Sequence, residues 1–526
     1  MLGVDTSAST KSALRDNLRS EVDGEQLWQR IQGLVYGRYI NYARVHPGVH
    51  EFIRRARVAG HEVFIVSHKT QFGHQDEKRT PLRDAALSWL TERGIVGGGP
   101  QQIPQSRVLF ADSRDAKVDI IDELSFDVFV DDLPEVLFHP DFPSRTRRLL
   151  FTTPNPTSTV SNGDSMQTID ITALSSWGEI GSHTLGELTD RDVVALAGVE
   201  WPHIPITAAR RISGHGNSRI FRIYGNETSY ALKSYPDLRH DSRPRRTTEW
   251  LALMEASAAG LSVPRPIATS ENLNWSLIEW VEGVRLDPTA VESVAHAVQF
   301  VDDLRRLSKS NSNSFGLATE ACLRPSQVLE QIDARISRLS LVQDENLICY
   351  LRDEIAPARD VATRRATSAL GKAWDAELAP SLRVLNPSDF GFHNALMTKS
   401  GRVVFFDFEY FGWDDPVKLV ADFLLHPGSS LGLELQRRWI NDMVARFADD
   451  EGFVVRLDSC LHLYAVRWAL IMLNEFLGDK SRNRLQARGT LDVDLRGLQA
   501  SQLEKSRNML RTTLPNLTTG DWRSPR

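Results

Sequence analysis

Three polar residues in the C-terminal third of the chain have the types and the spacing that phosphoryl transfer requires. Asp389 is followed five residues later by Asn394, and a turn and an apolar strand then lead to Asp407. Transfer of a phosphoryl group from ATP needs an acidic group beside the attacking hydroxyl and two oxygen ligands for Mg²⁺. The spacing therefore predicts a kinase site in which Asp389 is the candidate base and Asp407 a candidate magnesium ligand.

The triplet Asp389-Phe390-Gly391 invites a different assignment, because the same three residue types carry the magnesium-binding Asp of protein kinases. We reject that assignment. Asn394 stands at the offset expected in a catalytic loop, and the second acid, Asp407, follows a strand, as a magnesium-binding Asp should. A purely structural interpretation makes Asp389 and Asn394 ordinary turn residues, a role that both types favour. The strand that ends at Asp407 favours the catalytic interpretation.

The residues upstream of this motif predict the half of the site that would hold ATP. Residues 211–233 read as a strand, a glycine-containing loop, a second strand, a hairpin turn and a third strand. Backbone amides of such a loop can approach phosphate oxygens, and a lysine on the third strand can neutralise the α- and β-phosphates. The third glycine of the usual loop is absent. The candidate ATP-binding residues are Gly214, Gly216, Asn217, Ser218 and Lys233.

The segment after Lys233 has a helical period and carries Glu249 in its first turn. Glu249 could pair with Lys233 and fix the lysine toward the nucleotide, or it could simply favour the positive N-terminus of the helix. We expect the ion pair. The apolar stretch 275–280 then predicts a strand, at the place where a hinge would hold adenine through backbone groups.

Residues from about 195 to 480 resemble the aminoglycoside phosphotransferase and choline kinase family, small-molecule kinases with a protein-kinase-like fold. The resemblance implies that Asp389 is catalytic, that Asn394 and Asp407 bind Mg²⁺, and that Lys233 contacts ATP. The family usually has a His two residues before the catalytic Asp; Pro387 stands there in this chain, which removes a support of the loop but no reacting group. The matching strings are residues 214–218, 231–233, 261–266, 388–394, 407–410, 413–416 and 422–423.

The first 152 residues predict a different unit. Apolar strands that end near Val66, Phe110 and Val130 alternate with helical segments, which favours a parallel, doubly wound, Rossmann-like sheet. Polar residues at the ends of these elements resemble the second, third and fourth motifs of haloacid-dehalogenase-type phosphatases, in which a Ser/Thr and a Lys hold phosphate and an acid pair helps to bind magnesium. These residues are Ser67, Lys117, Asp131 and Asp132.

The first motif of that phosphatase family is missing. Its nucleophile is an Asp at the end of the first strand, with a second Asp two residues on. Here Asp5 has only four residues before it, and Ser7 stands at the second position. We therefore expect a haloacid-dehalogenase-like domain that is inactive as written, through either a misplaced gene start or decay of the domain. A role as a scaffold or a dimerisation surface is favoured over catalysis.

Composition is that of a large enzyme and excludes few functions. The 526 residues carry a net charge of −6 with interspersed signs, which gives no case for nucleic acid as a partner. Three cysteines, Cys322, Cys349 and Cys460, show no metal-binding spacing and fit a reduced cytoplasmic setting. We recognise no signal peptide or membrane segment.

These observations divide the chain into five parts: a haloacid-dehalogenase-like α/β domain (1–152), a linker (153–194), the N-lobe (195–285) and C-lobe (286–480) of a bilobal kinase-like α+β domain, and a loosely held polar segment (481–526). We expect an ATP- and Mg²⁺-dependent kinase acting on a hydroxyl of a small metabolite. Two alternatives stay open: a nucleotide-binding pseudokinase or scaffold, and a bifunctional sugar kinase–phosphatase if the true N-terminus is longer. Homo-oligomerisation and the identity of the acceptor also stay open.

Overall fold

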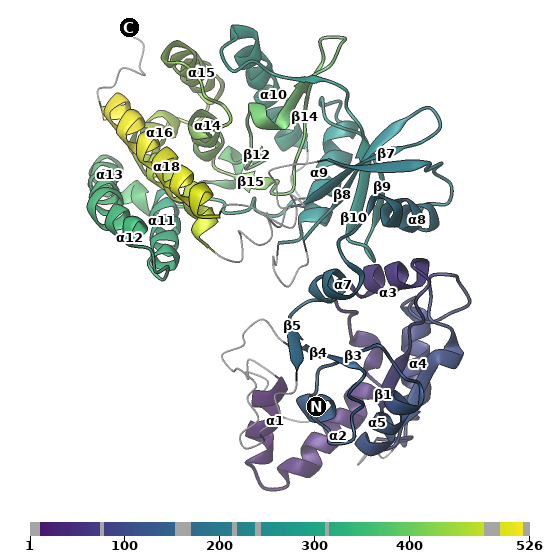
Figure 1. Ribbon diagram of the computed structural model, residues 1–526. Helices are drawn as coiled ribbons and strands as arrows, with labels where there is room; N and C mark the ends of the chain where they lie inside the picture. The colour runs from purple at the N-terminus through teal and green to yellow at the C-terminus, as the bar shows by residue number, and fades with distance from the viewer. Residues whose placement is uncertain are drawn as a thin grey trace. The chain divides into compact units, whose positions relative to one another are not determined.

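The computed structural model describes residues 11–73, 78–152, 170–212, 218–236, 243–310, 315–477 and 495–518, with side chains described from 14 to 513. The chain divides into two compact units, Met1–His203 and Ile204–Arg526 (Figure 1). Among the described residues, no helix combines the length and the apolar character needed to cross a bilayer.

The first unit alternates short strands with helices, as its sequence predicts. β1 pairs with β2, β3 with β4 and β4 with β5, and all three pairings are parallel. Its elements are α1 (Lys11–Arg19), α2 (Gly24–Tyr36), α3 (Val49–Val58), β1 (Ile65–His68), α4 (Leu82–Glu92), β2 (Val108–Ala111), α5 (Arg114–Glu123), β3 (Val128–Asp131), α6 (Pro134–Leu137), β4 (Arg147–Phe151), β5 (Ile171–Leu174), α7 (Trp177–Leu185) and α8 (Asp190–Glu200).

The parallel strands of the first unit form two separate sheets, β1-β2 and β3-β4-β5. Val66 of β1 nevertheless packs against the apolar cluster that contains Phe129 of β3 and Val118 and Ile121 of α5. Among the described residues, β1 and β3 face a shared core without a ladder of hydrogen bonds between them.

The expected linker at 153–194 carries more structure than its composition indicates. Residues 153–169 lie outside the described residues, but residues 171–174 form β5, and α7 and the start of α8 follow. Ser176 and Thr189 are N-caps, because their hydroxyls accept hydrogen bonds from the backbone N–H groups of Glu179 and Asp192, each at 3.1 Å. Polar residues of this region therefore start helices, and the first unit extends to His203 instead of ending at Thr152.

The second unit begins with a five-stranded antiparallel sheet in the order β6-β7-β8-β10-β9, with α9 packed on β9 and β10 (Figure 1). The predicted run of strand, loop, strand, turn and strand is confirmed for the described residues, with β8 in the middle of the sheet. Phe221, Leu232 and Leu277 are fully buried. The elements are β6 (Ala208–Ile212), β7 (Arg219–Tyr224), β8 (Ser229–Ser234), α9 (Arg245–Ala258), β9 (Pro266–Ser270), β10 (Trp275–Glu279) and β11 (Val284–Arg285).

The rest of the second unit is mainly helical. Short antiparallel pairs, β12 with β15 and β13 with β14, carry the catalytic-loop motif between the helices. The elements are α10 (Val291–Ser310), α11 (Pro325–Leu339), α12 (Glu345–Tyr350), α13 (Ala356–Leu370), β12 (Val384–Asn386), β13 (Ala395–Met397), β14 (Val403–Phe405), β15 (Gly412–Asp414), α14 (Pro416–Leu425), α15 (Leu433–Arg446), α16 (Phe453–Met472) and α18 (Leu495–Thr518).

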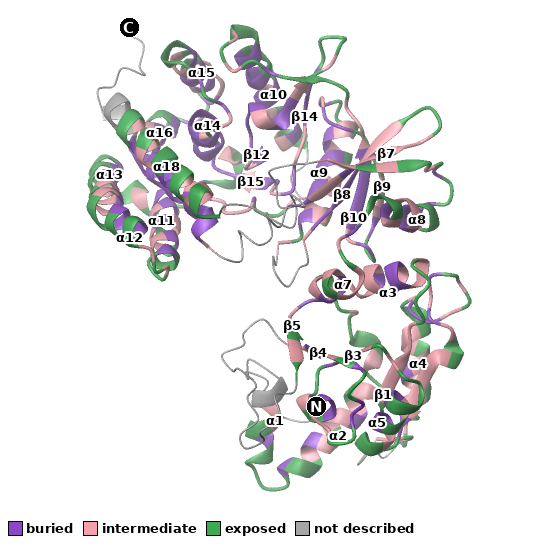
Figure 2. Ribbon diagram, in the orientation of Figure 1, coloured by how far each residue is buried: buried purple, intermediate pink, exposed green. Residues whose placement is uncertain are grey.

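Helix α14 is the centre of this helical part, since all ten of its residues are buried (Figure 2). Phe423 packs against Trp439 of α15 with ring centroids 4.1 Å apart. A helix buried on every side is normally apolar all round. α14 instead carries Lys418 and Asp422 among its buried residues, so these charges must be paired inside the core.

The C-terminal segment differs from the loose tail that its polarity suggests. Residues 495–518 form α18, which packs on α16 and buries Leu503 and Leu510. Ser506 donates to the carbonyl of Ala469 at 2.8 Å. The leucines lie two helical turns apart, so one apolar stripe docks the helix while its other face stays polar. The remaining residues of this segment lie outside the described part of the chain.

Candidate active site

Lys233 on β8 lies among three carboxylates that the fold brings together from distant parts of the sequence. Its Nζ atom is 2.8 Å from Oε2 of Glu249, 2.5 Å from Oδ1 of Asp407 and 3.3 Å from Oε2 of Glu409. The predicted pair of Lys233 and Glu249 is confirmed. Asp407 was predicted to be a site residue, as a magnesium ligand. Glu409 was not assigned to the site.

The side chain of Glu249 is fixed at both oxygens. Oε2 accepts hydrogen bonds from Lys233 and from the hydroxyl of Tyr235, the latter at 2.7 Å. Oε1 accepts from the backbone N–H of Phe408 at 3.2 Å. Because Glu249 is itself buried, these bonds compensate its desolvation and hold α9 beside Asp407.

Glu409 completes the cluster. It is paired with Arg245, and Oε2 accepts a hydrogen bond from the hydroxyl of Ser218 at 3.1 Å. Ser218 is the one residue of the predicted ATP-binding loop that the structure describes; Gly214, Gly216 and Asn217 lie outside the described residues. The end of this loop is therefore tied to the cluster through Glu409.

Among the residues that the structure describes, the contacts of the cluster join three carboxylates with two cations. Glu249, Asp407 and Glu409 supply three carboxylates against the two cations Lys233 and Arg245. Burial, opposed by Lys233 and reinforced by the other two carboxylates, raises the pKa of Asp407 to about 7. Burial alone would lower the pKa of Lys233, but the three carboxylates raise it well above its usual value. A bound cation would favour the ionised form of Asp407.

Asn394 and Asp407 flank the β13–β14 hairpin, one just before it and one just after it. The backbone N–H of Phe406 donates to the carbonyl of Asn394 at 3.0 Å, which places the end of the Asp407 strand beside the catalytic loop. The amide nitrogen of Asn394 donates to the carbonyl of Asp389 at 2.9 Å, so its amide oxygen is left for a ligand. Together with the Asp407 carboxylate, this gives the hard oxygen donors that Mg²⁺ prefers.

Asp389 lies in the loop that follows β12. Oδ1 accepts a hydrogen bond from Nε2 of His393 at 3.1 Å. Burial alone would raise the pKa of Asp389, but the hydrogen bond from His393, the field of His393 and His426 and the bond with Asn394 bring it below its usual value. Asp389 is therefore ionised at neutral pH, as a proton acceptor must be.

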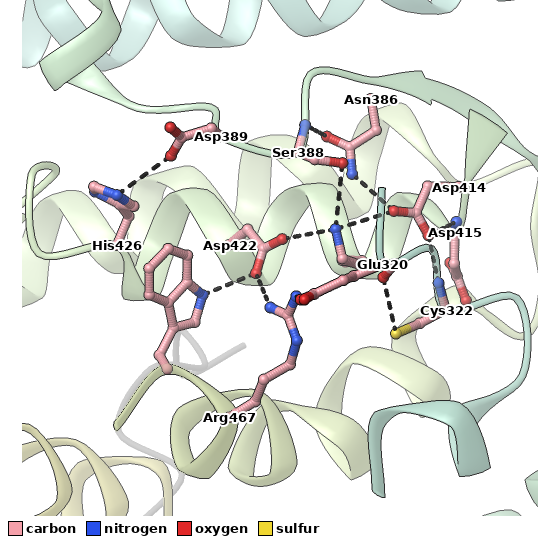
Figure 3. Close-up of polar contacts among 12 residues, drawn as sticks. Glu320, Cys322, Asn386, Ser388, Asp389, Asp414, Asp415, Asp422, His426 and Arg467 are labelled. Carbon is pink, nitrogen blue, oxygen red and sulfur yellow. Dashed lines mark hydrogen bonds and ion pairs between the residues drawn. The ribbon is translucent and has the colours of Figure 1, made fainter. Parts of the chain in front are cut away.

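The loop is supported even though Pro387 replaces the expected His. The amide nitrogen of Asn386 donates to Oδ2 of Asp414 at 3.2 Å, and the amide oxygen of Asn386 accepts from the backbone N–H of Ser388 at 2.9 Å (Figure 3). Ser388 has a φ of 64°, which is costly for a residue other than glycine. These two bonds hold the strained residue that directly precedes Asp389.

Lys418 lies beneath the same loop. Its Nζ atom is 3.1 Å from Oδ2 of Asp414 and 3.0 Å from Oδ2 of Asp422, and 3.5 Å from the hydroxyl of Ser388. Asp422 is also paired with Arg467 of α16 at 3.3 Å. A buried ion network therefore links the catalytic loop to α14 and α16, and it compensates the charges buried in α14.

A second histidine stands beside Asp389. Nε2 of His426 is 3.5 Å from Oδ1 of Asp389, and the rings of His393 and His426 stack with centroids 3.8 Å apart and planes 8° apart. Sequence reasoning assigned neither histidine. His393 lies inside the catalytic string and could have been flagged there, whereas His426 follows α14 and reaches the site only through the fold.

The acids downstream of Asp407 are already paired. These acids are Glu409, Asp414 and Asp415. All three are buried, and Glu409 and Asp414 are paired with the cations described above. Asp415 caps α14 by accepting from the backbone N–H of Val417 at 2.9 Å, and it pairs with Arg456 at 3.0 Å.

In the first unit, the structure brings together two of the four residues that resemble phosphatase motifs, Lys117 and Asp131. Nζ of Lys117 on α5 is 2.5 Å from Oδ2 of Asp131 at the end of β3, and both residues are buried. Oδ1 of Asp131 accepts from the backbone N–H of Leu133 at 3.0 Å. Ser67 is half-buried on β1 and Asp132 is exposed after β3; in the described part of the chain, neither is bonded to this pair.

Comparison with known proteins points to the same part of the chain. Residues 207–454, a little under half of the chain, match the model of the phosphotransferase enzyme family APH. No curated protein matches the chain. The matched residues lie within the second unit, whose kinase-like, mixed α/β fold is similar to that of this family.

Several solved structures are similar at low identity. A choline/ethanolamine kinase family protein from Mesorhizobium loti has 17% identity and a TM-score of 0.40, with 60% of this chain and 92% of that chain covered. Choline kinase LicA from Streptococcus pneumoniae has 12% identity and a TM-score of 0.40, covering 60% and 98%. Spectinomycin phosphotransferase APH(9)-Ia has 10% identity and a TM-score of 0.41, also covering 60% and 98%.

Proposed function

We propose that the second unit transfers the γ-phosphoryl group of ATP to a hydroxyl group of a small molecule and requires Mg²⁺. The observation that carries this proposal is the cluster around Lys233, in which Glu249 and Asp407 both bond the lysine nitrogen. Such a lysine, held by a helix carboxylate next to the magnesium-binding Asp, is the arrangement that positions ATP phosphates in protein kinases. The match of residues 207–454 to a phosphotransferase family supports it.

Each residue then has a defined task. Asp389 accepts or orients the proton of the attacking hydroxyl, and Lys233 steadies the α- and β-phosphates. Asn394 and Asp407 would hold Mg²⁺, which when bound neutralises charge on the phosphate oxygens. Backbone amides at Gly214, Gly216, Asn217 and Ser218 would approach the phosphates. Glu249 keeps Lys233 in place.

Nucleotide binding tests this proposal directly. Thermal unfolding would be measured with ATP alone, Mg²⁺ alone and both, for the wild type, Asp407→Ala and the control Glu451→Ala, which removes an exposed acid. We expect stabilisation that needs both ligands in the wild type and in the control, and none in Asp407→Ala. An unchanged unfolding temperature of the wild type under all conditions would contradict the kinase proposal and favour a scaffold.

We also propose that the first unit is a phosphatase-like domain without phosphatase activity. Two observations support this: Lys117 is neutralised by buried Asp131, and the parallel strands are divided between β1 and β3. The assay is hydrolysis of p-nitrophenyl phosphate with Mg²⁺. We expect no hydrolysis above background; hydrolysis that disappears in Asp131→Ala would show that the unit is a working phosphatase.

The state of the cysteines bears on the cell compartment in which the protein acts. Cys322 and Cys460 are free and buried, and Cys349 is free and exposed. An exposed free thiol is stable in a reducing compartment. We therefore propose a cytoplasmic location, where ATP is also available, and a small hydroxylated metabolite as the partner.

A further inference from the structure

Both histidines of the site, His393 and His426, contact the same carboxylate oxygen of Asp389. Nε2 of His393 is 3.1 Å and Nε2 of His426 is 3.5 Å from Oδ1 (Figure 3 shows the contact with His426). A carboxylate has two equivalent oxygens and can turn to present either of them. Because both imidazole rings lie against Oδ1, the two oxygens of Asp389 are no longer equivalent.

The tautomer of His426 is set by its other nitrogen. The backbone N–H of Gly428 donates to Nδ1 of His426 at 2.9 Å, so Nδ1 is an acceptor and carries no proton. In the neutral ring the proton is then on Nε2, the atom that faces Asp389. Burial and the neighbouring His393 lower the pKa of His426 to about 4, which fits a neutral ring. The Nε2–H group of His426 therefore faces the carboxylate, 3.5 Å from Oδ1.

The same tautomer of His426 is unfavourable for binding a metal ion between Asp389, His393 and His426. Two histidines and a carboxylate with ligand atoms within 4.8 Å of one another have the composition of a transition-metal site. A metal would need the lone pair of Nε2, and the proton would have to move to Nδ1, against the N–H of Gly428. The N–H group of His426 thus faces the carboxylate, where a metal ion would need a lone pair.

The ring of His426 is also fixed in orientation. It stacks on His393, and the edge of Trp468 packs against it with centroids 4.7 Å apart. The indole nitrogen of Trp468 donates to Oδ1 of Asp422 at 2.8 Å, and Asp422 belongs to the buried ion network. Side chains locked by packing and by further hydrogen bonds hold a reacting group to a narrow geometry.

We infer that His426 and His393 are positioning residues that reserve Oδ1 of Asp389, so that Oδ2 alone receives the acceptor proton. This inference rests on the proposed kinase function. As the acceptor oxygen bonds to the γ-phosphorus, the bond from that phosphorus to the β–γ bridging oxygen breaks and ADP leaves. The hydroxyl proton passes to Oδ2. A single, oriented proton acceptor lowers the orientational cost of reaching the transition state.

Spectroscopy of ¹⁵N-histidine tests the placement of His426 without requiring any catalysis. The labelled full-length protein would be compared with His426→Gln, which assigns the signal, and with Asp389→Asn, which removes the charged acceptor. We expect the His426 signals of the tautomer protonated on Nε2, and a shift of the Nε2 signal in Asp389→Asn. Signals of the tautomer protonated on Nδ1 would overturn the inference.

Kinetics test the consequence, with water as the acceptor and release of ADP as the readout. In His426→Leu we expect kcat to fall by about tenfold to 10²-fold with an unchanged KM for ATP. His426→Gln, which retains an N–H donor, should recover part of the loss, and His296→Leu, at an exposed histidine of α10, should behave as the wild type.

The two experiments separate the two proposals. Wild-type kcat in His426→Leu, in a protein that turns over ATP, would overturn the positioning role. A wild-type protein that binds no ATP with Mg²⁺ would overturn the kinase proposal, and the histidine spectra would still decide how His426 is held.

Discussion

Glu249 on α9 accepts a hydrogen bond from the backbone N–H of Phe408, the residue that directly follows Asp407. Its other oxygen holds Lys233. Asp407 itself has a φ of 71°, a left-handed conformation that is rare outside glycine, asparagine and aspartate. One buried carboxylate thus fixes both the lysine that we propose binds ATP and the turn that carries the aspartate that we propose binds magnesium.

We expect Glu249→Ala to weaken binding of ATP with Mg²⁺ and to lower stability. The substitution leaves the N–H of Phe408 and the hydroxyl of Tyr235 without their acceptor, and breaking a buried ion pair costs about 3–5 kcal/mol. Urea unfolding and nucleotide titration measure the two effects. Glu271→Ala, at an exposed position of the same part of the fold, is the control, and equal behaviour of the two variants would contradict the role given to Glu249.

Asp389→Ala should separate catalysis from binding. Removal of a general base lowers kcat by about 10²–10⁴-fold, whereas Lys233 and Asp407 remain to bind the nucleotide. ADP release and the thermal shift with ATP and Mg²⁺ check the two halves of this prediction. Asp375→Ala changes an exposed Asp of the same unit and should match the wild type. Retained turnover in Asp389→Ala would show that another residue receives the proton.

Lys418→Met should destabilise the second unit by about 3–5 kcal/mol, because it leaves Asp414 and Asp422 buried with one cation fewer. Chemical unfolding followed by tryptophan fluorescence measures the change. Lys372→Met, at an exposed lysine, should stay within about 0.5 kcal/mol of the wild type. A stable Lys418→Met protein would mean that the two aspartates take up protons or water instead.

The first unit should lose stability as the pH falls from about 6.5 to about 4. Burial, reinforced by Arg54, lowers the pKa of His50 to about 4, whereas in the unfolded chain His titrates near its usual pKa of about 6.5. Between these values the unfolded state binds more protons, so lower pH favours unfolding, by up to about 3 kcal/mol for this residue.

Replacing that histidine tests the assignment. His50→Gln has no proton to take up, so its stability should change less between pH 7 and pH 4.5 than that of the wild type in urea unfolding. His61→Gln, at an exposed histidine, should keep the wild-type pH dependence. The same slope in all three proteins would assign the acid sensitivity to other groups.

The candidate reacting residues can be named from the sequence because they lie in short strings with fixed spacing. Asp389 and Asn394 share one loop, and Asp407 ends the next hairpin. Lys233 and Glu249 are separated by a single connection, so the choice between an ion pair and a helix-end effect could be stated in advance. The structure resolves that choice in favour of the pair.

What surrounds these residues could not be read from the sequence, because it comes from segments that meet only through tertiary packing. His426 follows α14 and Arg467 lies in α16, yet both reach the catalytic loop region. One signal was available: Lys418 and Asp422 stand in an otherwise apolar helix and had to be paired. The caps in the expected linker and the leucine stripe of α18 were likewise hidden by polar composition.

The buried ion network also predicts which residues related chains carry at these positions. Loss of Lys418 would remove the cation that Asp414 and Asp422 share, and loss of either acid would leave the lysine with a single carboxylate partner. Substitutions at these three positions should therefore be inherited together or not at all, and related chains should fall into two groups, one with the charged set and one with an apolar or amide set. The catalytic loop above them would then carry a different residue at 388, since the hydroxyl that reaches Lys418 loses its partner.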